Sequence, residues 1–270
     1  MSVLRSVKRF ISGFASRAGY AAETHVRWAE RMYAVCSSYA EQSKCEGEVA
    51  AAAERICREF AYSHHDARWI ALNNIATTAK ANQLVLNLLD SWSRGDERVR
   101  AAIPHLLGIA TVTPEAVKSA GYWLGSNSRL GFVLIAQFQI ENLVKNLSRE
   151  LNLKPPQPYY TAVRNLLERL GLSQGLETLN VPALIRNSLH SNGIHHGYRG
   201  ESKTVIVHGV TYEFVHGHRV RCANWEHVAH ALEGSLGVLG QVLDHDDVRG
   251  IADPMMDAYA WDVATEPASA

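Results

Sequence analysis

Apolar residues recur at helical spacing along most of the chain, and this pattern predicts a mainly α-helical fold. Residues 21–92 are rich in alanine and in charged residues four apart, which favours helix throughout. Polar residues at 42–44 and 63–65 divide this region into three segments. We therefore expect three antiparallel helices here, within an N-terminal helical bundle that covers residues 1–120.

Three further signals mark the end of this bundle. A polar connection at 91–97 leads to a short helix, which Pro104 is expected to break. Thr113-Pro114-Glu115 is typical of a helix start, because Thr113 can cap the helix and Pro114 suits its first turn. The sequence G-Y-W-L-G-S-N at 121–127 is rich in loop residues. We predict a domain boundary there.

The second predicted domain, residues 121–248, starts with the most regular helix of the chain, Arg129–Leu151. Its apolar residues line one face at the helical period, and Glu141 lies roughly a quarter turn from that face. The proline-rich connector at 154–158 is expected to be extended. A second helix, Tyr159–Leu172, then returns beside the first.

Residues 204–220 carry the β-strand signal of the chain. β-Branched and aromatic residues flank two candidates for tight turns, His208-Gly209 and His216-Gly217. Two such turns predict a small three-stranded meander. Asn224 is then expected to cap a closing helix, Trp225–Leu243.

Residues 180–197 contain the clearest candidate for chemistry. Arg186 and His190 are four residues apart, so a helix places a guanidinium and an imidazole on the same flank. Pro182 suits the first turn of this helix, and Gly193 suits a left-handed stop, which puts His190 in the last turn. A separate apolar stripe on the same helix consists of Val181, Leu184, Ile185 and Leu189.

The polar residues of these helices have two interpretations each. Arg186 and His190 are either a functional pair or part of an ordinary solvated helix face. Glu141 either forms a surface ion pair with Lys145, four residues on, or is a carboxylate at the edge of the core that orients a neighbouring imidazole. Spacing alone leaves both choices open.

Composition narrows the possible functions. The chain has 270 residues and no formal net charge, which gives no global electrostatic argument for binding nucleic acid or membranes. No apolar run approaches the roughly 20 residues that cross a bilayer, so we expect no membrane association. The cysteines show no C-x-x-C spacing and indicate reduced thiols in a cytoplasmic protein. They are Cys36, Cys45, Cys57 and Cys222.

The two ends of the chain differ from the rest in composition. The first 22 residues are basic and resemble a transit peptide, although an amphipathic helix or a frayed terminus is the preferred interpretation. Residues 249–270 are expected to form an acidic C-terminal tail.

Histidines gather near the β-strand signal, which makes a metal site an alternative to consider. Together with His195, His196 and His208, the pair His216-x-His218 could supply three imidazoles to zinc or another divalent ion. No cysteine or carboxylate stands at the usual spacing around them, and H-E-x-x-H is absent. We therefore expect no metal and no other cofactor.

The order of elements from residue 126 to 243 resembles the HEPN superfamily, whose small helical domains occur in RNases of toxin and antiphage systems. The specific part of the resemblance is Arg186-Asn187-Ser188-Leu189-His190. Family members typically dimerise so that two such motifs face each other, bind RNA phosphate with the Arg and cleave RNA with the His without metal. By this resemblance, Glu141 matches the first-helix carboxylate that supports the motif.

The resemblance implies an RNA-directed effector, a metal-independent ribonuclease of a defence or toxin type system. Arg186 would hold phosphate, His190 would act as general acid and base, and Asn187 would orient one of them. Active members usually have a longer interval between Arg and His than the three residues found here. Non-catalytic RNA binding or protein interaction is one alternative, and a metal-dependent enzyme that uses the His-rich hairpin is another. The expected partners are RNA and a second copy of the chain, joined through the C-terminal domain.

Overall fold

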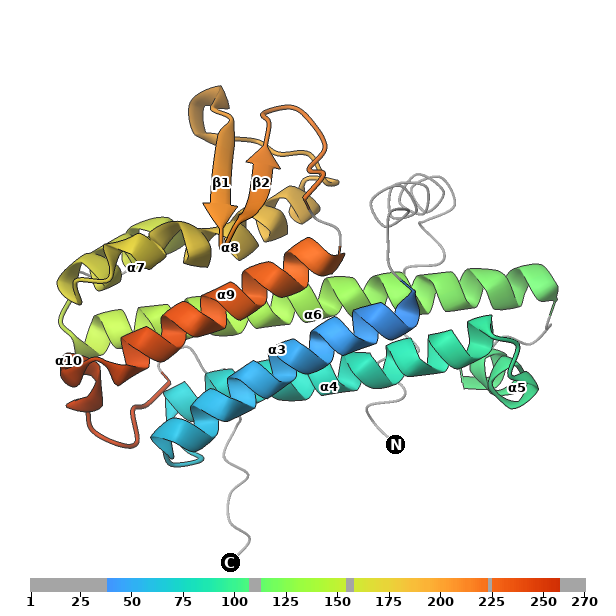
Figure 1. The fold of residues 1–270 in the computed structure, drawn as a ribbon, viewed down its shortest axis with the longest axis horizontal. Helices are drawn as coiled ribbons and strands as arrows, with labels where there is room; N and C mark the ends of the chain where they lie inside the picture. Colours follow the sequence, from blue (N-terminus) through green and yellow to red (C-terminus); the bar gives the residue numbers. More distant parts are fainter. Residues whose placement is uncertain (1–37, 107–112, 154–157, 223–224, 258–270) are drawn as a thin grey trace, which may run out of the picture.

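Helix α6 (Pro114–Glu150) runs along most of the molecule, and several other helices pack against it (Figure 1). The computed structural model describes residues 38–106, 113–153, 158–222 and 225–257. As predicted, α6 begins at Pro114. The mainly α-helical class is confirmed, since the strands of the described residues form one small sheet.

Within the described residues, three helices precede α6, and the first two of these form an antiparallel pair joined by the turn predicted near residues 63–65. The third continues through Pro104, so the predicted break is wrong; a proline removes only one backbone hydrogen bond, and the helix tolerates its loss. The helix predicted before residue 38 lies outside the described residues. The bounds of the three helices are α3 (Tyr39–Phe60), α4 (Ala67–Ser93) and α5 (Glu97–Leu106).

The predicted break at residues 42–44 is also wrong, because these residues lie in the first turns of α3. A capping box between Ser38 and Glu41 starts the helix. Gln42 and Ser43 are buried, and the backbone carbonyl of Gln42 accepts a hydrogen bond from the indole of Trp225 at 3.1 Å. Polar residues that predicted a loop are thus buried between helices instead.

The loop predicted at residues 121–127 is wrong for a related reason, since α6 passes through it without interruption. A Cβ atom added to Gly121 would lie 2.5 Å from the ring of Trp92, and one added to Gly125 would lie 3.0 Å from Leu89. Glycine at these two positions therefore lets α4 approach α6 closely, at a cost in helix propensity that the packing offsets.

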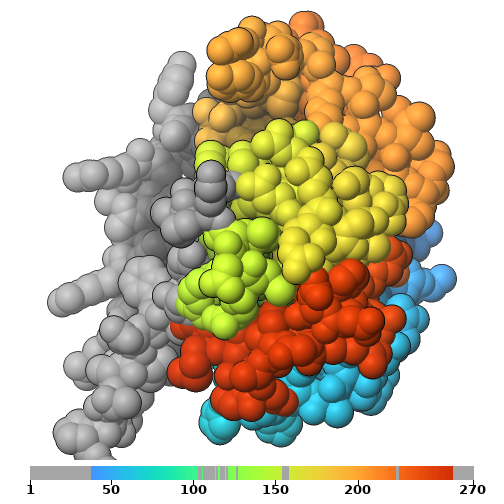
Figure 2. Space-filling view, turned by 90° about the vertical axis from the view of Figure 1, so that its left-hand side faces the viewer, coloured from blue at the N-terminus to red at the C-terminus, as the bar shows by residue number. Residues whose placement is uncertain are grey.

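The C-terminal half packs against both α6 and the N-terminal helices. Figure 2 shows, from one end, the β-hairpin at the top, α7 below it, and then α9 above α3 and α4. The closing helix that was predicted from Trp225 is observed as α9. The elements are α7 (Tyr159–Arg169), η1 (Ser173–Gly175), α8 (Leu176–His190), η2 (Tyr198–Gly200), β1 (Lys203–Val207), β2 (Val210–Phe214), α9 (Trp225–Asp244) and α10 (Asp246–Arg249).

The predicted turn at His208-Gly209 joins β1 to β2. His208 has φ 46° and Gly209 has φ 83°, the two left-handed residues of a type I′ hairpin turn. The three-stranded meander, in contrast, is wrong, because the sheet has two strands. After the turn at His216-Gly217, Arg219 makes a single bridge to Ile194, which precedes the hairpin, instead of continuing along β2.

Buried apolar side chains from both sides of the predicted boundary at residues 120 and 121 form one cluster. It takes residues from α3, α4, α6, α7, α8, the hairpin and α9. Burial of this kind is the main favourable contribution to folding. Among the described residues, no helix has both the length and the apolar character to cross a membrane.

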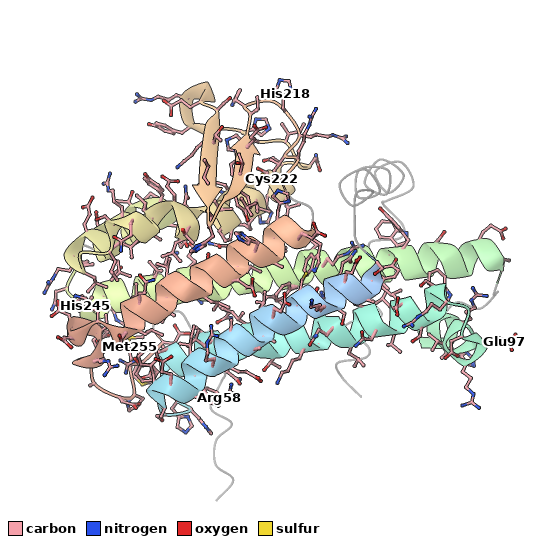
Figure 3. All side chains as sticks on the ribbon, in the orientation of Figure 1. Arg58, Glu97, His218, Cys222, His245 and Met255 are labelled. Atoms are coloured by element: carbon pink, nitrogen blue, oxygen red, sulfur yellow. The ribbon has the colours of Figure 1, made fainter. Side chains whose placement is uncertain are left out.

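The start of the predicted C-terminal tail is packed rather than free. Asp66 caps α4 and forms a buried ion pair with Arg68, whose guanidinium donates to both carboxylate oxygens at 2.6 and 2.8 Å. Arg68 also donates to the carbonyl of Val248, and the Met255 N–H donates to Asp66 at 2.6 Å. This Asp66–Arg68 clamp holds the segment after α9 against the first turn of α4. Figure 3 places Met255 at the same end of the molecule as His245.

Candidate functional site

Helix α8 carries the Arg186 motif, and a side chain of α9 contacts its backbone. It begins at Leu176, so Pro182 lies inside the helix and not in its first turn as predicted. A proline cannot donate to the carbonyl four residues earlier, which is that of Thr178. The hydroxyl of Ser235 on α9 approaches this carbonyl at 3.2 Å and also donates to Ala231 at 2.8 Å. The Ser235 hydroxyl therefore replaces, in part, the backbone N–H that would otherwise donate to the Thr178 carbonyl.

The end of α8 agrees with the prediction. The helix ends at His190, and Gly193 follows with φ 78°. The N–H of Gly193 donates to the carbonyl of Ser188 at 2.7 Å, which closes the helix with a left-handed glycine. His190 therefore lies in the last turn, immediately before the chain leads into the hairpin region.

Arg186 meets Glu141 across the interface of α8 and α6. The Nη2 group of Arg186 donates to Oε2 of Glu141 at 3.2 Å, and Lys145 donates to the other carboxylate oxygen at 2.6 Å. The predicted ion pair of Glu141 with Lys145 is thus observed, and the second contact of this carboxylate is to the motif arginine and not to an imidazole. The carboxylate of Glu141 thus lies between the charged groups of Arg186 and Lys145. Arg186 and Glu141 keep 27% and 17% of their side-chain surface exposed, so solvent and ligands can reach them.

A buried tyrosine lies within electrostatic range of this ion pair. The hydroxyl of Tyr159 donates to the carbonyl of Leu179 at 2.9 Å, which ties the start of α7 to α8. Burial raises the pKa of Tyr159, and the negative charge of Glu141 adds to this effect, while a hydrogen bond with Gln137 and the charge of Arg186 oppose it. Tyr159 therefore stays neutral and links α7 to α8. Nε of Arg186 is buried and makes no hydrogen bond with any described residue.

The other two predicted site residues point to solvent. Asn187 and His190 are both exposed, and neither side chain makes a hydrogen bond or ion pair within the described part of the chain. His190 lies one helical turn after Arg186, on the same flank of α8. The fold thus brings Glu141 to Arg186, and it leaves the amide and the imidazole available beside them.

The histidines of the alternative metal site are divided between two places. His195 is buried against Phe214, with ring centres 5.4 Å apart, and burial lowers its pKa, as do the nearby His216 and His196. His208 lies at the other end of the hairpin, in its turn. Across the described ranges, no group of three His, Cys, Asp or Glu side chains is arranged to hold a metal ion.

A second cluster of polar side chains, which was not predicted from the sequence, links the hairpin to α9. The hydroxyl of buried Tyr212 lies 3.0 Å from Nδ1 of His230 and 2.9 Å from the carbonyl of His227, to which it donates. Burial lowers the pKa of both histidines. An aromatic residue in a strand, such as Tyr212, is a recognisable signal for burial. No signal in the sequence indicated that His227 and His230 of α9 would contact it.

A buried carboxylate between α3 and α4 was also not predicted from the sequence. Glu46 is fully buried and accepts a hydrogen bond from the amide of Asn82. Burial raises the pKa of Glu46 to about 8, against the opposing effects of the Asn82 hydrogen bond and the Arg129 charge. The second oxygen of Glu46 and the Asn82 carbonyl oxygen have no hydrogen-bond partner among the described residues.

Comparisons with protein-family models, with curated proteins and with solved structures found no match.

Proposed function

We propose that the protein is a HEPN-like, RNA-directed effector that cleaves RNA without metal, in a cytoplasmic system of the defence or toxin type. The observation that carries this proposal is the ion pair between Arg186 and Glu141. It places a motif guanidinium on a partly exposed flank that also presents His190. The motif resemblance supplies the chemistry, and the geometry supplies an arrangement in which that chemistry can occur.

The proposed reaction is attack of the RNA 2′-hydroxyl on the neighbouring phosphate. The 2′-oxygen bonds to phosphorus, the bond from phosphorus to the 5′-oxygen breaks, and the products carry a 2′,3′-cyclic phosphate and a 5′-hydroxyl. An imidazole near neutrality can accept the 2′-hydroxyl proton, and an imidazolium can protonate the leaving 5′-oxygen. Arg186 stabilises the charge that develops on the phosphate. The contact to Glu141 uses one of its five N–H groups and leaves others for this task.

The same proposal includes a symmetric dimer through the C-terminal domain. Ile135 and Phe138 lie on one face of α6, two turns or fewer before Glu141, and are 42% and 47% exposed. Contiguous apolar side chains on a helix face are typical of an interaction surface. A two-fold axis near this face would bring two copies of the Arg186 motif together.

The deciding experiment is incubation of the purified protein with RNA in EDTA, with DNA of the same sequence as the control. We expect RNA to be cut to products with 2′,3′-cyclic phosphate ends, and DNA to stay intact because it lacks the 2′-hydroxyl. His190→Ala should lower the rate by about 10²- to 10⁴-fold, the usual range for general acid–base help. Arg186→Lys should rescue poorly, since a point charge does not reproduce the fork of a guanidinium.

His65→Ala is a matched control, because His65 is an exposed imidazole in the turn before α4, far along the chain from the motif. It should cut RNA at the wild-type rate. The second candidate function is a non-catalytic RNA-binding or interaction module, which the Arg186–Glu141 contact between two helices also fits. Binding of RNA without cleavage under any condition would favour that module. If Arg186→Ala lowers only the thermal stability, with no RNA bound or cut, the ion pair is purely structural.

A further inference from the structure

Two loops beyond the hairpin lie side by side and form one surface. Residues 194–202 precede β1 and residues 215–221 follow β2. The His195 N–H donates to the His218 carbonyl at 2.9 Å, the Gly217 N–H donates to the His195 carbonyl at 2.8 Å, and Gly197 donates to the His216 ring at 3.1 Å. Figure 3 shows His218 at the end of the hairpin region away from α9. We call these paired segments the loop surface.

A tight turn in the loop surface presents an aromatic ring to solvent. Tyr198 is 76% exposed, the largest exposure among the described bulky apolar side chains. Gly197 allows the turn, because a Cβ atom there would lie 1.7 Å from the Glu201 carbonyl oxygen. The guanidinium of Arg199 lies 5.1 Å from the centre of the Tyr198 ring. The Tyr198 ring therefore faces solvent, with the Arg199 guanidinium beside it.

The loop surface also concentrates positive charge. Arg199, Arg219 and Arg221 are exposed and make no ion pair within the described part of the chain. Residues 191–222 hold four Lys or Arg and two Glu, while the whole chain is formally neutral, so the remainder carries a net charge of −2. Lys203 is engaged by Glu177 at 2.6 Å, which leaves the three arginines as the available cations.

We propose that the loop surface binds a single-stranded segment of RNA. A base stacks on Tyr198, and the three arginines contact phosphates. A stacking ring among guanidinium groups fits a polymer that carries both bases and phosphates, whereas an acidic peptide offers nothing to the ring. The surface adjoins the motif, because the Val220 N–H donates to the carbonyl of Gly193, three residues after His190. This inference rests on the proposed function, since the bound strand would continue to Arg186.

The test measures binding separately from cleavage. His190→Ala is used as the background so that cleavage is slow compared with the measurement, and a short fluorescein-labelled oligouridylate is titrated by fluorescence anisotropy. Tyr198→Ala should weaken binding by about tenfold or more, as expected for loss of one base–aromatic stack. Arg219→Gln should weaken it as well and reduce the slope of log K against log salt by about 0.7, the value for one phosphate contact on a single strand.

Two matched controls accompany these variants. Tyr160 is also an exposed tyrosine beside a cation, 5.5 Å from Lys203, but it lies on α7, so Tyr160→Ala should bind like the background. Arg58 lies on α3, on the side of the molecule opposite His218 (Figure 3), and Arg58→Gln should leave the salt slope unchanged.

The outcomes separate this inference from the proposed function. If Tyr198→Ala and Arg219→Gln bind as tightly as the controls while the wild type cuts RNA, the loop surface is not the RNA site, although the enzyme proposal stands. Weakened binding in both variants with no cleavage by the wild type supports the loop surface and removes the enzyme. Equal competition by polyglutamate would overturn the inference, because it would show that negative charge alone is recognised.

Discussion

At the scale of the residue, Glu46 shows how strongly this fold can oppose an ionised side chain. The carboxyl group is fully buried between α3 and α4, and its pKa is raised to about 8 from an ordinary value of 4.5. The folded state therefore binds a proton that the unfolded state has already released, over the range from about pH 4.5 to 8. Stability from this group is fully present below pH 4.5 and is lost as the pH rises through 8.

We expect the free energy of unfolding of the wild type to fall between pH 5 and pH 8 relative to that of Glu46→Gln. The amide of glutamine resembles the protonated acid in shape and cannot ionise. The difference between the two proteins should change by up to about 1.4 kcal/mol per pH unit. Urea unfolding followed by circular dichroism at a series of pH values measures it directly.

Glu59→Gln is the control for this experiment, because Glu59 is exposed on the same helix. Its unfolding free energy should follow the wild type at every pH. A constant difference between wild type and Glu46→Gln from pH 5 to pH 8 would contradict the raised pKa of Glu46.

Single residues also show what could be predicted from the sequence about the site. The positions of Arg186 and His190 on one flank followed from helical spacing, and the stop at Gly193 followed from its freedom to adopt a left-handed conformation. The contact of Glu141 with Arg186 depended on the family resemblance, since 45 residues separate the two in the chain. Glu46 was missed because burial of a polar side chain is decided by the neighbouring helix, which spacing within α3 does not reveal.

At the scale of the element, Pro182 in α8 and Ser235 in α9 form a pair whose coupling can be measured. Loss of the Ser235 hydroxyl leaves the Thr178 carbonyl without that donor, so Ser235→Ala should destabilise the protein by about 1–2 kcal/mol. In a Pro182→Ala background the backbone N–H at this position can donate to the same carbonyl. Ser235→Ala should then cost less, and a double-mutant cycle of unfolding free energies gives the difference.

Ser148→Ala serves as the comparison, because the buried Ser148 hydroxyl has no hydrogen-bond partner among the described residues. Its cost should be the same in the wild-type background and in the Pro182→Ala background. Equal costs of Ser235→Ala in the two backgrounds would show that the hydroxyl does not compensate for the proline.

Elements were predicted well where local signals and packing agree, and poorly where packing overrides the local signal. The starts of α6 at Pro114 and α9 at Trp225 and the tight turn at His208-Gly209 were predicted correctly. The continuation of α6 through residues 121–127 was not, since glycine favours a loop locally. The close approach of Trp92 to Gly121 could not be predicted, because it depends on which helix packs against this part of α6.

At the scale of the whole molecule, the exposed apolar face of α6 leads to a prediction about assembly. Light scattering should give about twice the chain mass of 29.9 kDa. Phe138→Asp places a charge in the centre of this face and should give the monomer, because burial of an unpaired carboxylate is costly. A strict monomer of the wild type at high concentration would contradict the dimer.

Leu84→Asp is the control for assembly, since Leu84 is 63% exposed but lies on α4. It should leave the mass unchanged. If Leu84→Asp dissociates the dimer and Phe138→Asp does not, the two copies join through the other side of the molecule.

The Asp66–Arg68 clamp has a consequence for the order in which this chain can fold as it is synthesised. Arg68 and Asp66 emerge from the ribosome early, but the groups that complete their hydrogen bonding lie about 180 to 190 residues later, at Val248, Ala252 and Met255. Until those residues emerge, the first turn of α4 must keep its ion pair in water. Native closure of this end of the bundle therefore waits for nearly the whole described chain, and contacts of such long range make folding slow.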